Sequence, residues 1–244
     1  MEGTRRLPAA PSRLLAASTR PRAVATLAGC AILVAVLGVL FAHQTTADGF
    51  DRAVDAPLVT VFSGHSALAD VFAFPGTTIP AVVLSAAMVV ACLLTRRIDG
   101  AVLAAVAVPA AVGLNDALLK PWVHRSYLGQ PAYPSGHTAS VSALAATTIV
   151  LLLASPRPRR RLRTSILAVT YLLTVSVVVG VIGMPYHYFT DTVAGAAVGT
   201  GTVCALALLL DLIPAVRPSR TPAVPPARIP AVRPSRTPRR SAAS

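Results

Sequence analysis

Six long, almost uncharged apolar blocks constrain this chain more than any other feature. They run approximately over residues 23–43, 76–95, 100–119, 138–155, 165–183 and 192–212. Each block is close to the ~20 helical residues that cross the roughly 30 Å hydrocarbon core of a bilayer. Charged residues make up only 13% of the chain, whereas about 25% is typical of a soluble domain. We therefore predict an all-α integral membrane bundle of six helices.

Basic residues distinguish the two sides of this predicted bundle. Nineteen of the 22 lie in the two tails and in the loops after the second and fourth blocks. The other three are Arg52, Lys120 and Arg125. The positive-inside rule then predicts cytoplasmic termini and three extracytoplasmic loops. A cleaved signal peptide in place of the first span is the alternative, and it leaves the later spans facing the same way.

The segments outside the blocks divide the chain into three parts. We predict a basic cytoplasmic tail over residues 1–22, a six-span domain over 23–213 and a disordered tail over 214–244. A ten-residue repeat, rich in Pro and Arg, begins at Ile213 and again at Ile229. Such a composition forms no packed core, and the tail's charge suits contact with anionic lipid headgroups. Residues 44–75 are expected to form one or two short interfacial helices.

Chemical groups concentrate in two of the predicted extracytoplasmic loops. The first contains Pro134-Ser135-Gly136-His137, directly before the fourth block. Ser135 is a natural helix N-cap, and Gly136 lets an anion approach the backbone at a helix N-terminus. His137 then lies in the first turn, where it can donate a proton to a leaving oxygen. An ordinary helix start that happens to include a histidine is the alternative.

The second loop contains His187 and Asp191, four residues apart. On a helix this spacing places both side chains on one face. The carboxylate can then fix the imidazole tautomer and leave the other ring nitrogen free to attack; a simple surface pair is the alternative. Lys120 and Arg125 add positive charge, and Asp116 lies one turn before Lys120 and can pair with it. The alternative to a functional lysine is an ordinary Lys–Asp pair in which the lysine snorkels toward the membrane surface.

Taken in order, these motifs resemble the type 2 phosphatidic acid phosphatase family, the membrane relatives of vanadium haloperoxidases. The resemblance covers roughly residues 50–210. It implies that His187 is a nucleophile that forms a phosphohistidine, that Asp191 orients it, and that His137 protonates the leaving alcohol. It further implies that the phosphate oxygens are held by Lys120, Arg125, Ser135 and the backbone of Gly136. It implies no metal and no cofactor.

Three departures from the family pattern stand out. Only four residues separate Lys120 from Arg125, where the family has six between its Lys and Arg. The family's Ser-Arg pair falls at Gly180 and Val181, so the arginine that clamps the phosphate is absent. Loss of such a charge-assisted donor costs a few kcal/mol of transition-state stabilisation. His124, beside Arg125, has no assigned role.

These observations favour a phosphatase acting on a membrane lipid. Undecaprenyl or other polyprenyl pyrophosphate, phosphatidic acid and phosphatidylglycerol phosphate all fit, with a cell-envelope role if the organism is bacterial. A family member that binds lipid phosphate without turning it over is the second hypothesis. A non-enzymatic transporter or structural membrane protein is the third, but the spans show no inverted repeat. Nucleic-acid partners are not expected, and the sequence does not predict an oligomeric state.

Overall fold

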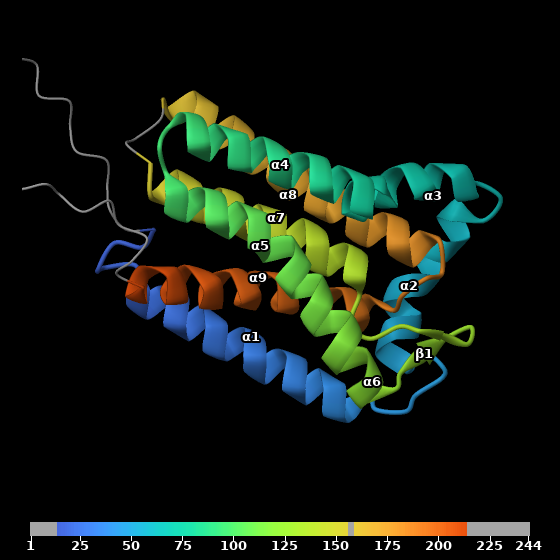
Figure 1. Cartoon of the computed structure of the whole chain (residues 1–244). Coiled ribbons are helices and arrows are strands. Elements are labelled where there is room, and N and C mark those ends of the chain that lie inside the picture. The colour runs from blue at the N-terminus through green and yellow to red at the C-terminus, as the bar shows by residue number, and fades with distance from the viewer. Residues whose placement is uncertain (1–13, 156–158, 214–244) are drawn as a thin grey trace, which may run out of the picture.

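The structure, a computed structural model, describes residues 14–155 and 159–213 (Figure 1). The tail predicted over 214–244 and most of the tail predicted over 1–22 lie outside the described residues. The elements in chain order are α1 (Arg20–Leu40), α2 (Gly49–Phe62), α3 (Ser66–Ala73), η1 (Phe74–Gly76), α4 (Thr78–Leu94), α5 (Ile98–Leu114), the π-helical η2 (Asn115–Leu119), α6 (Lys120–Val123), β1 (Ser126–Tyr127), β2 (Gln130–Pro131), α7 (Gly136–Leu153), α8 (Arg160–Gly183) and α9 (Phe189–Leu212).

Six helical stretches in the described part of the chain are long and apolar enough to cross a membrane. They are α1, the run from α3 through η1 to α4, the run from α5 through η2 to α6, and then α7, α8 and α9. The predicted all-α six-helix architecture is therefore confirmed. The outer faces of the bundle expose large apolar side chains, such as Val39 on α1 and Val82 on α4. These faces suit contact with lipid rather than water.

Helix α9 packs against α1, α5 and α7 (Figure 1). Gly195 and Gly199 of α9 face α7, and a Cβ at either position would overlap a backbone carbonyl oxygen, of Ser135 or of Ala139. Small residues four apart allow helix backbones to approach closely in membrane proteins. The Gly195–Gly199 stripe therefore holds the start of α7, which carries the Pro-Ser-Gly-His motif, against the start of α9.

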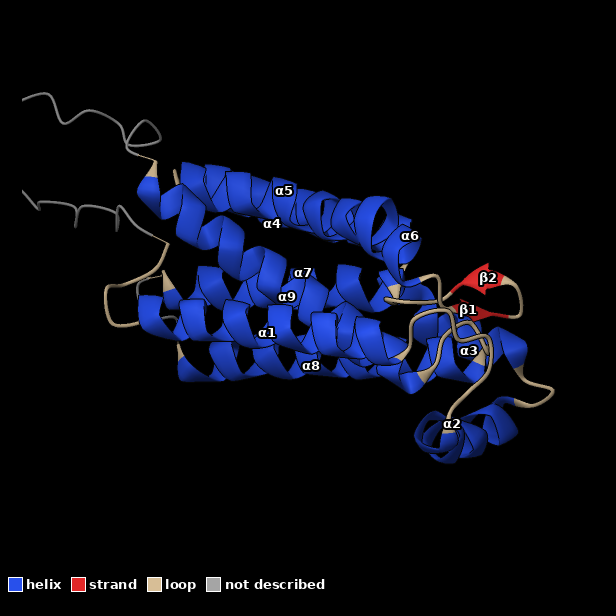
Figure 2. Ribbon diagram, turned by 90° about the horizontal axis from the view of Figure 1, so that it is seen from below, coloured by secondary structure: helices blue, strands red, loops and turns tan. Residues whose placement is uncertain are grey.

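The described chain ends lie together at one end of the bundle (Figures 1 and 2). The Asp211 carboxylate near the end of α9 accepts hydrogen bonds from the backbone of Leu14 and Leu15 and from Arg20. The opposite end carries α2, α3, α6 and the β1–β2 hairpin (Figure 2). Both predicted motif loops are at this second end, so the bundle separates the chemical groups from the chain ends.

Residues 44–75 contain two short helices, α2 and α3, in agreement with the one or two short helices predicted there. Helix α2 lies between the first two spans, whereas α3 begins the second span. Helix α3 lies across α8, and the contact point is Gly180. A Cβ at Gly180 would overlap the backbone nitrogen of Ala73. The crossing therefore requires glycine at this position.

Candidate active site

A polar pocket of about 570 Å³ opens at the end of the bundle that carries the motif loops. Four of the residues predicted for the site line it, namely Lys120, Gly136, His137 and His187. Thr77 and Thr78 at the start of α4 also line it, and sequence reasoning did not single them out. Since α4 and α7 both begin at this pocket, the unpaired backbone N–H groups of two helix N-termini are available to an anion there.

The two predicted histidines face each other in this pocket. Their ring centroids are 6.3 Å apart in an edge-to-face arrangement. A hydrogen bond of 3.0 Å from the backbone nitrogen of Ser135 to the carbonyl oxygen of Asp191 ties the two motif loops together. The Ser135 hydroxyl accepts from the backbone nitrogen of Thr138, so the predicted N-cap is confirmed. That hydroxyl is buried and is not part of the pocket lining.

The environment of His187 keeps its ring neutral. Burial, with the nearby charges of His137 and Lys120, lowers the pKa of His187 to about 3, although a backbone hydrogen bond opposes the shift. Its Nδ1 lies 2.8 Å from the carbonyl oxygen of Ala132, so the Nδ1–H donates to that oxygen. Nε2 then carries the lone pair, and it has no hydrogen-bond partner in the described chain. A neutral imidazole with a free Nε2 is the form required of a nucleophile.

Asp191 does not make the direct hydrogen bond to His187 that the four-residue spacing predicts. The nearest carboxylate oxygen lies 4.0 Å from Nδ1, which is too long for a hydrogen bond. Helix α9 begins only at Phe189, so the two residues do not share one helix face. Asp191 instead accepts a hydrogen bond from the backbone nitrogen of Tyr188 at 3.0 Å. The Ala132 carbonyl therefore takes the tautomer-fixing role expected of the carboxylate.

Arg125 lies in a buried ion-pair network and not in the pocket lining, in contrast to its predicted role. Its guanidinium contacts Asp51 at 2.5 Å and Asp191 at 2.7 Å, and all three side chains are fully buried. It also donates to the Thr190 hydroxyl at 2.7 Å. The guanidinium is sandwiched between two aromatic rings, those of Phe41 and Tyr188. Arg125 therefore holds the Asp191 carboxylate through an ion pair and does not face a bound phosphate.

Helix α2 supplies two carboxylates that cap the N-terminus of α9. The backbone nitrogen of Phe189 donates to Asp55 at 3.2 Å, and that of Thr190 donates to Asp51 at 3.0 Å. These side-chain oxygens satisfy two of the backbone N–H groups that a helix N-terminus leaves without an intrahelical partner. Sequence reasoning did not assign Asp51 or Asp55 to the site; their i, i+4 spacing was the available signal. These contacts fix the helix start that follows His187.

Lys120 forms the predicted pair with Asp116, at 2.8 Å. The π-helical turn η2 carries Asp116, and Asn115 from the same turn donates to the carbonyl oxygen of Pro134 at 3.2 Å. π-helical turns occur frequently at functional sites. This turn therefore links the lysine to the Pro-Ser-Gly-His loop. His124, which had no assigned role, stacks on His43 with centroids 5.4 Å apart and does not line the pocket.

Val181 stands at the position where the family pattern has its phosphate-clamping arginine. This side chain is fully buried and packs with Ala73, Val141 and Val177. The adjacent Gly180 forms the close crossing with α3. The contact between α3 and α8 therefore occupies the place where the family carries its Ser-Arg pair.

Residues 114–212 match a family model. The match is to the PAP2 superfamily. The match is consistent with the family predicted from the motifs, and PAP2 superfamily members are phosphatases. The matched segment contains every motif residue from Lys120 to Asp191, but it leaves out α2 with its two capping carboxylates. No curated protein and no solved structure is significantly similar to the chain.

Proposed function

We propose that this PAP2 superfamily protein is a membrane phosphatase that hydrolyses a lipid phosphate or a polyprenyl pyrophosphate through a phosphohistidine intermediate. The observation that carries the proposal is the placement of His137 and His187, with centroids 6.3 Å apart, on one polar pocket. One histidine is held neutral with Nε2 free. The other lies at a helix N-terminus beside the only cation that lines the pocket in the described chain, Lys120.

The reaction proceeds in two displacements. Nε2 of His187 attacks phosphorus, and the bond from phosphorus to the leaving oxygen breaks while His137 donates a proton to that oxygen. Water then attacks phosphorus as His137 accepts its proton, the bond between phosphorus and Nε2 of His187 breaks, and inorganic phosphate leaves. His187 gains positive charge in the first step, and Asp191, 4.0 Å from its ring, stabilises that charge through space.

The phosphate oxygens are held by Lys120 and by the backbone N–H groups of Gly136 and of the first turn of α4. Ser135 contributes indirectly, because its hydroxyl caps α7. Arg125 contributes indirectly through its ion pair with Asp191. This set has fewer cationic donors than the family pattern, and the two helix N-termini supply part of the difference.

The site faces the extracytoplasmic side of the membrane, and both termini face the cytoplasm. This orientation is supported by the basic character of the side of the bundle at which the described chain starts and stops. On that side, the Arg97 side chain donates hydrogen bonds to Leu151 and Ser155, beside the α7–α8 loop. Basic loops remain on the cytoplasmic side. Labelling a cysteine placed at Ser126 with a membrane-impermeant thiol reagent in intact cells tests this orientation, and protection of that cysteine contradicts it.

The direct test of the proposed activity compares two histidine variants. Purified His187→Ala is expected to release phosphate from lipid phosphates at least about a thousandfold more slowly than the wild type, because the nucleophile is lost. His65→Ala, an exposed histidine outside the pocket, is the matched control and retains activity. Undiminished phosphate release by His187→Ala excludes the mechanism.

A second candidate function is binding of lipid phosphate without turnover. The observation that favours it is the apolar packing of Val181 at the position of the family's clamp arginine, together with the burial of Arg125 away from the pocket. A panel of phosphatidic acid, phosphatidylglycerol phosphate and undecaprenyl pyrophosphate separates the two candidates. Robust phosphate release from any of them eliminates this second function.

A further inference from the structure

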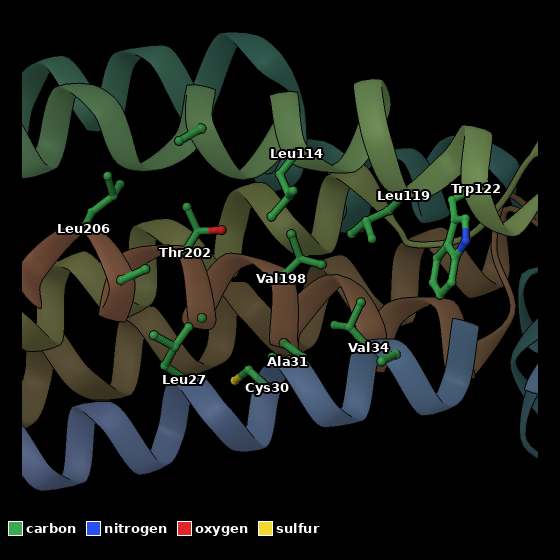
Figure 3. Close-up of a pocket in the computed structure, with 15 residues that line it drawn as sticks. Leu27, Cys30, Ala31, Val34, Leu114, Leu119, Trp122, Val198, Thr202 and Leu206 are labelled. Atoms are coloured by element: carbon green, nitrogen blue, oxygen red, sulfur yellow. The ribbon is translucent and has the colours of Figure 1, made fainter. Parts of the chain in front are cut away.

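Two apolar grooves run along the membrane-spanning part of the bundle. One, of about 490 Å³, lies between α1, α9 and the segment from α5 to α6 (Figure 3). The other, of about 370 Å³, lies between α4, α7 and α8. Either groove has the apolar character that a hydrocarbon chain requires, so the question is which of them a substrate bound in the polar pocket can reach.

The groove between α1 and α9 is separated from the polar pocket by the segment from α5 to α6. Leu114, Leu119 and Trp122 point from that segment into the groove (Figure 3). Asp116 and Lys120, from the same segment, line the polar pocket instead. The two spaces therefore lie on opposite faces of one helical segment.

The groove between α4, α7 and α8 continues from the polar pocket along two helix faces. On α7, Ser140 lines the pocket, and Leu144 and Thr148 line the groove. These three residues follow each other at i, i+4 spacing and so share one face. Thr77, the N-cap of α4, lines the pocket, and Leu84 of α4, seven residues on, lines the groove. One seam between α4 and α7 therefore leads from the histidines into the apolar part of the bundle.

The groove is long enough to hold much of a lipid chain within one leaflet. Its lining runs from Val141 to Thr148 on α7 and from Ser165 to Leu173 on α8, helical rises of roughly 10–12 Å at 1.5 Å per residue. Half of a hydrocarbon core of about 30 Å is roughly 15 Å. A long chain whose phosphate occupies the pocket can thus lie against the groove over most of its length, whereas a very short chain contacts only its upper part.

We propose that the groove between α4, α7 and α8 binds the hydrocarbon chain of the substrate, and that the small side chain of Ala145 keeps it open. The inference rests on the proposed phosphatase function and specifies which of the two apolar grooves holds the hydrocarbon chain of the substrate. Ala145 is half-buried and lines the groove on α7. A phenylalanine at this position fills part of the space that the chain requires.

The test compares Ala145→Phe with Ala205→Phe, which makes the same change at a half-buried alanine of the other groove. Phosphate release is measured with dioleoyl and with dihexanoyl phosphatidic acid in detergent. The ratio of kcat/KM for the long-chain over the short-chain lipid is expected to fall about tenfold in Ala145→Phe, because a few methylene groups lose their burial. The ratio is expected to stay at the wild-type value in Ala205→Phe.

A second measurement keeps failure of the groove distinct from failure of the proposed function. In the His187→Ala background, thermal stabilisation by dioleoyl phosphatidic acid reports binding without turnover, and Ala145→Phe is expected to weaken it while Ala205→Phe leaves it intact. If the wild type releases no phosphate, the phosphatase proposal fails and this binding measurement still decides the groove. The inference is overturned if Ala145→Phe leaves the kcat/KM ratio or the thermal stabilisation by dioleoyl phosphatidic acid unchanged. It is also overturned if Ala205→Phe lowers them as much as Ala145→Phe does.

Discussion

Replacing Arg125 with methionine separates its observed structural role from the phosphate-binding role that the sequence predicts. The substitution keeps much of the side-chain volume but leaves Asp51 and Asp191, both fully buried, without their cationic partner. Removing one member of a buried ion pair typically costs about 3–5 kcal/mol. For a chain of this size, 1 kcal/mol shifts the unfolding midpoint by roughly 2–4 °C, so we expect Tm to fall by about 6–20 °C.

The assay is thermal unfolding of purified protein in detergent, with phosphate release measured in parallel. Arg52→Met is the matched control, because Arg52 is an exposed arginine of α2 whose side chain donates a hydrogen bond to the Ala47 carbonyl oxygen. Its Tm should remain close to that of the wild type. The double variant Arg125→Met with Asp51→Asn should recover part of the loss, since one of the two uncompensated carboxylates is then neutral.

The opposite pattern refutes this reasoning. If Arg125→Met unfolds within about 2 °C of the wild type, the value expected for an exposed pair worth ~1 kcal/mol or less, the buried network does not stabilise the protein. If KM for a lipid phosphate also rises strongly, Arg125 contacts the phosphate directly, as the motif order first indicated.

Two further substitutions test the other unusual contacts. Gly180→Ser adds a Cβ that overlaps the Ala73 backbone, so we expect a loss of about 1–3 kcal/mol, measured as a lower Tm; an unchanged Tm shows that α3 does not cross α8 at this point. Burial and the charge of Asp51 raise the pKa of Asp55 from 3.8 to about 7, so its stabilising contribution is complete below pH ~4 and is lost as the pH rises through ~7. Asp55→Asn should therefore flatten the fall in Tm between pH 5 and pH 8, and a fall as steep as in the wild type contradicts the raised pKa.

The sequence predicted the bundle well because its signals are local. An uncharged block of about 20 residues is a complete signal for a span, and the Ser135 cap and the Asp116–Lys120 pair each depend on residues at most four apart. The placement of His137 and His187 on one pocket also followed, because both motifs belong to loops on the same predicted side of the membrane.

The parts that the sequence did not predict depend on contacts between distant segments. Asp51 and Thr190 are 139 residues apart in the chain, and no periodicity or motif connects them. The changed spacing between Lys120 and Arg125 was the one local sign that Arg125 has a different role. The glycine at position 180 likewise stands out as a departure from the family pattern, but its reason is a crossing helix that only the structure reveals.

The electrostatics of the pocket indicate that a bound phosphate competes with Asp116 for Lys120. Lys120 is the only cation that lines the pocket in the described residues, and its partner Asp116 lines the same pocket with a half-exposed side chain. Their formal charges cancel, so the attraction for an anion comes mainly from the N-termini of α4 and α7, each worth roughly half a positive charge.

Asp116→Asn should therefore lower KM for a lipid phosphate by up to about fivefold, because removing a partly exposed charge changes binding by ~0.2–1 kcal/mol, while kcat changes little. Asp70→Asn, an exposed carboxylate of α3 outside the pocket, should leave KM unchanged. A higher KM in Asp116→Asn gives the opposite conclusion, that the carboxylate holds Lys120 in place for the phosphate. The sign of this one change thus decides whether the pair is a competitor or a support for the substrate.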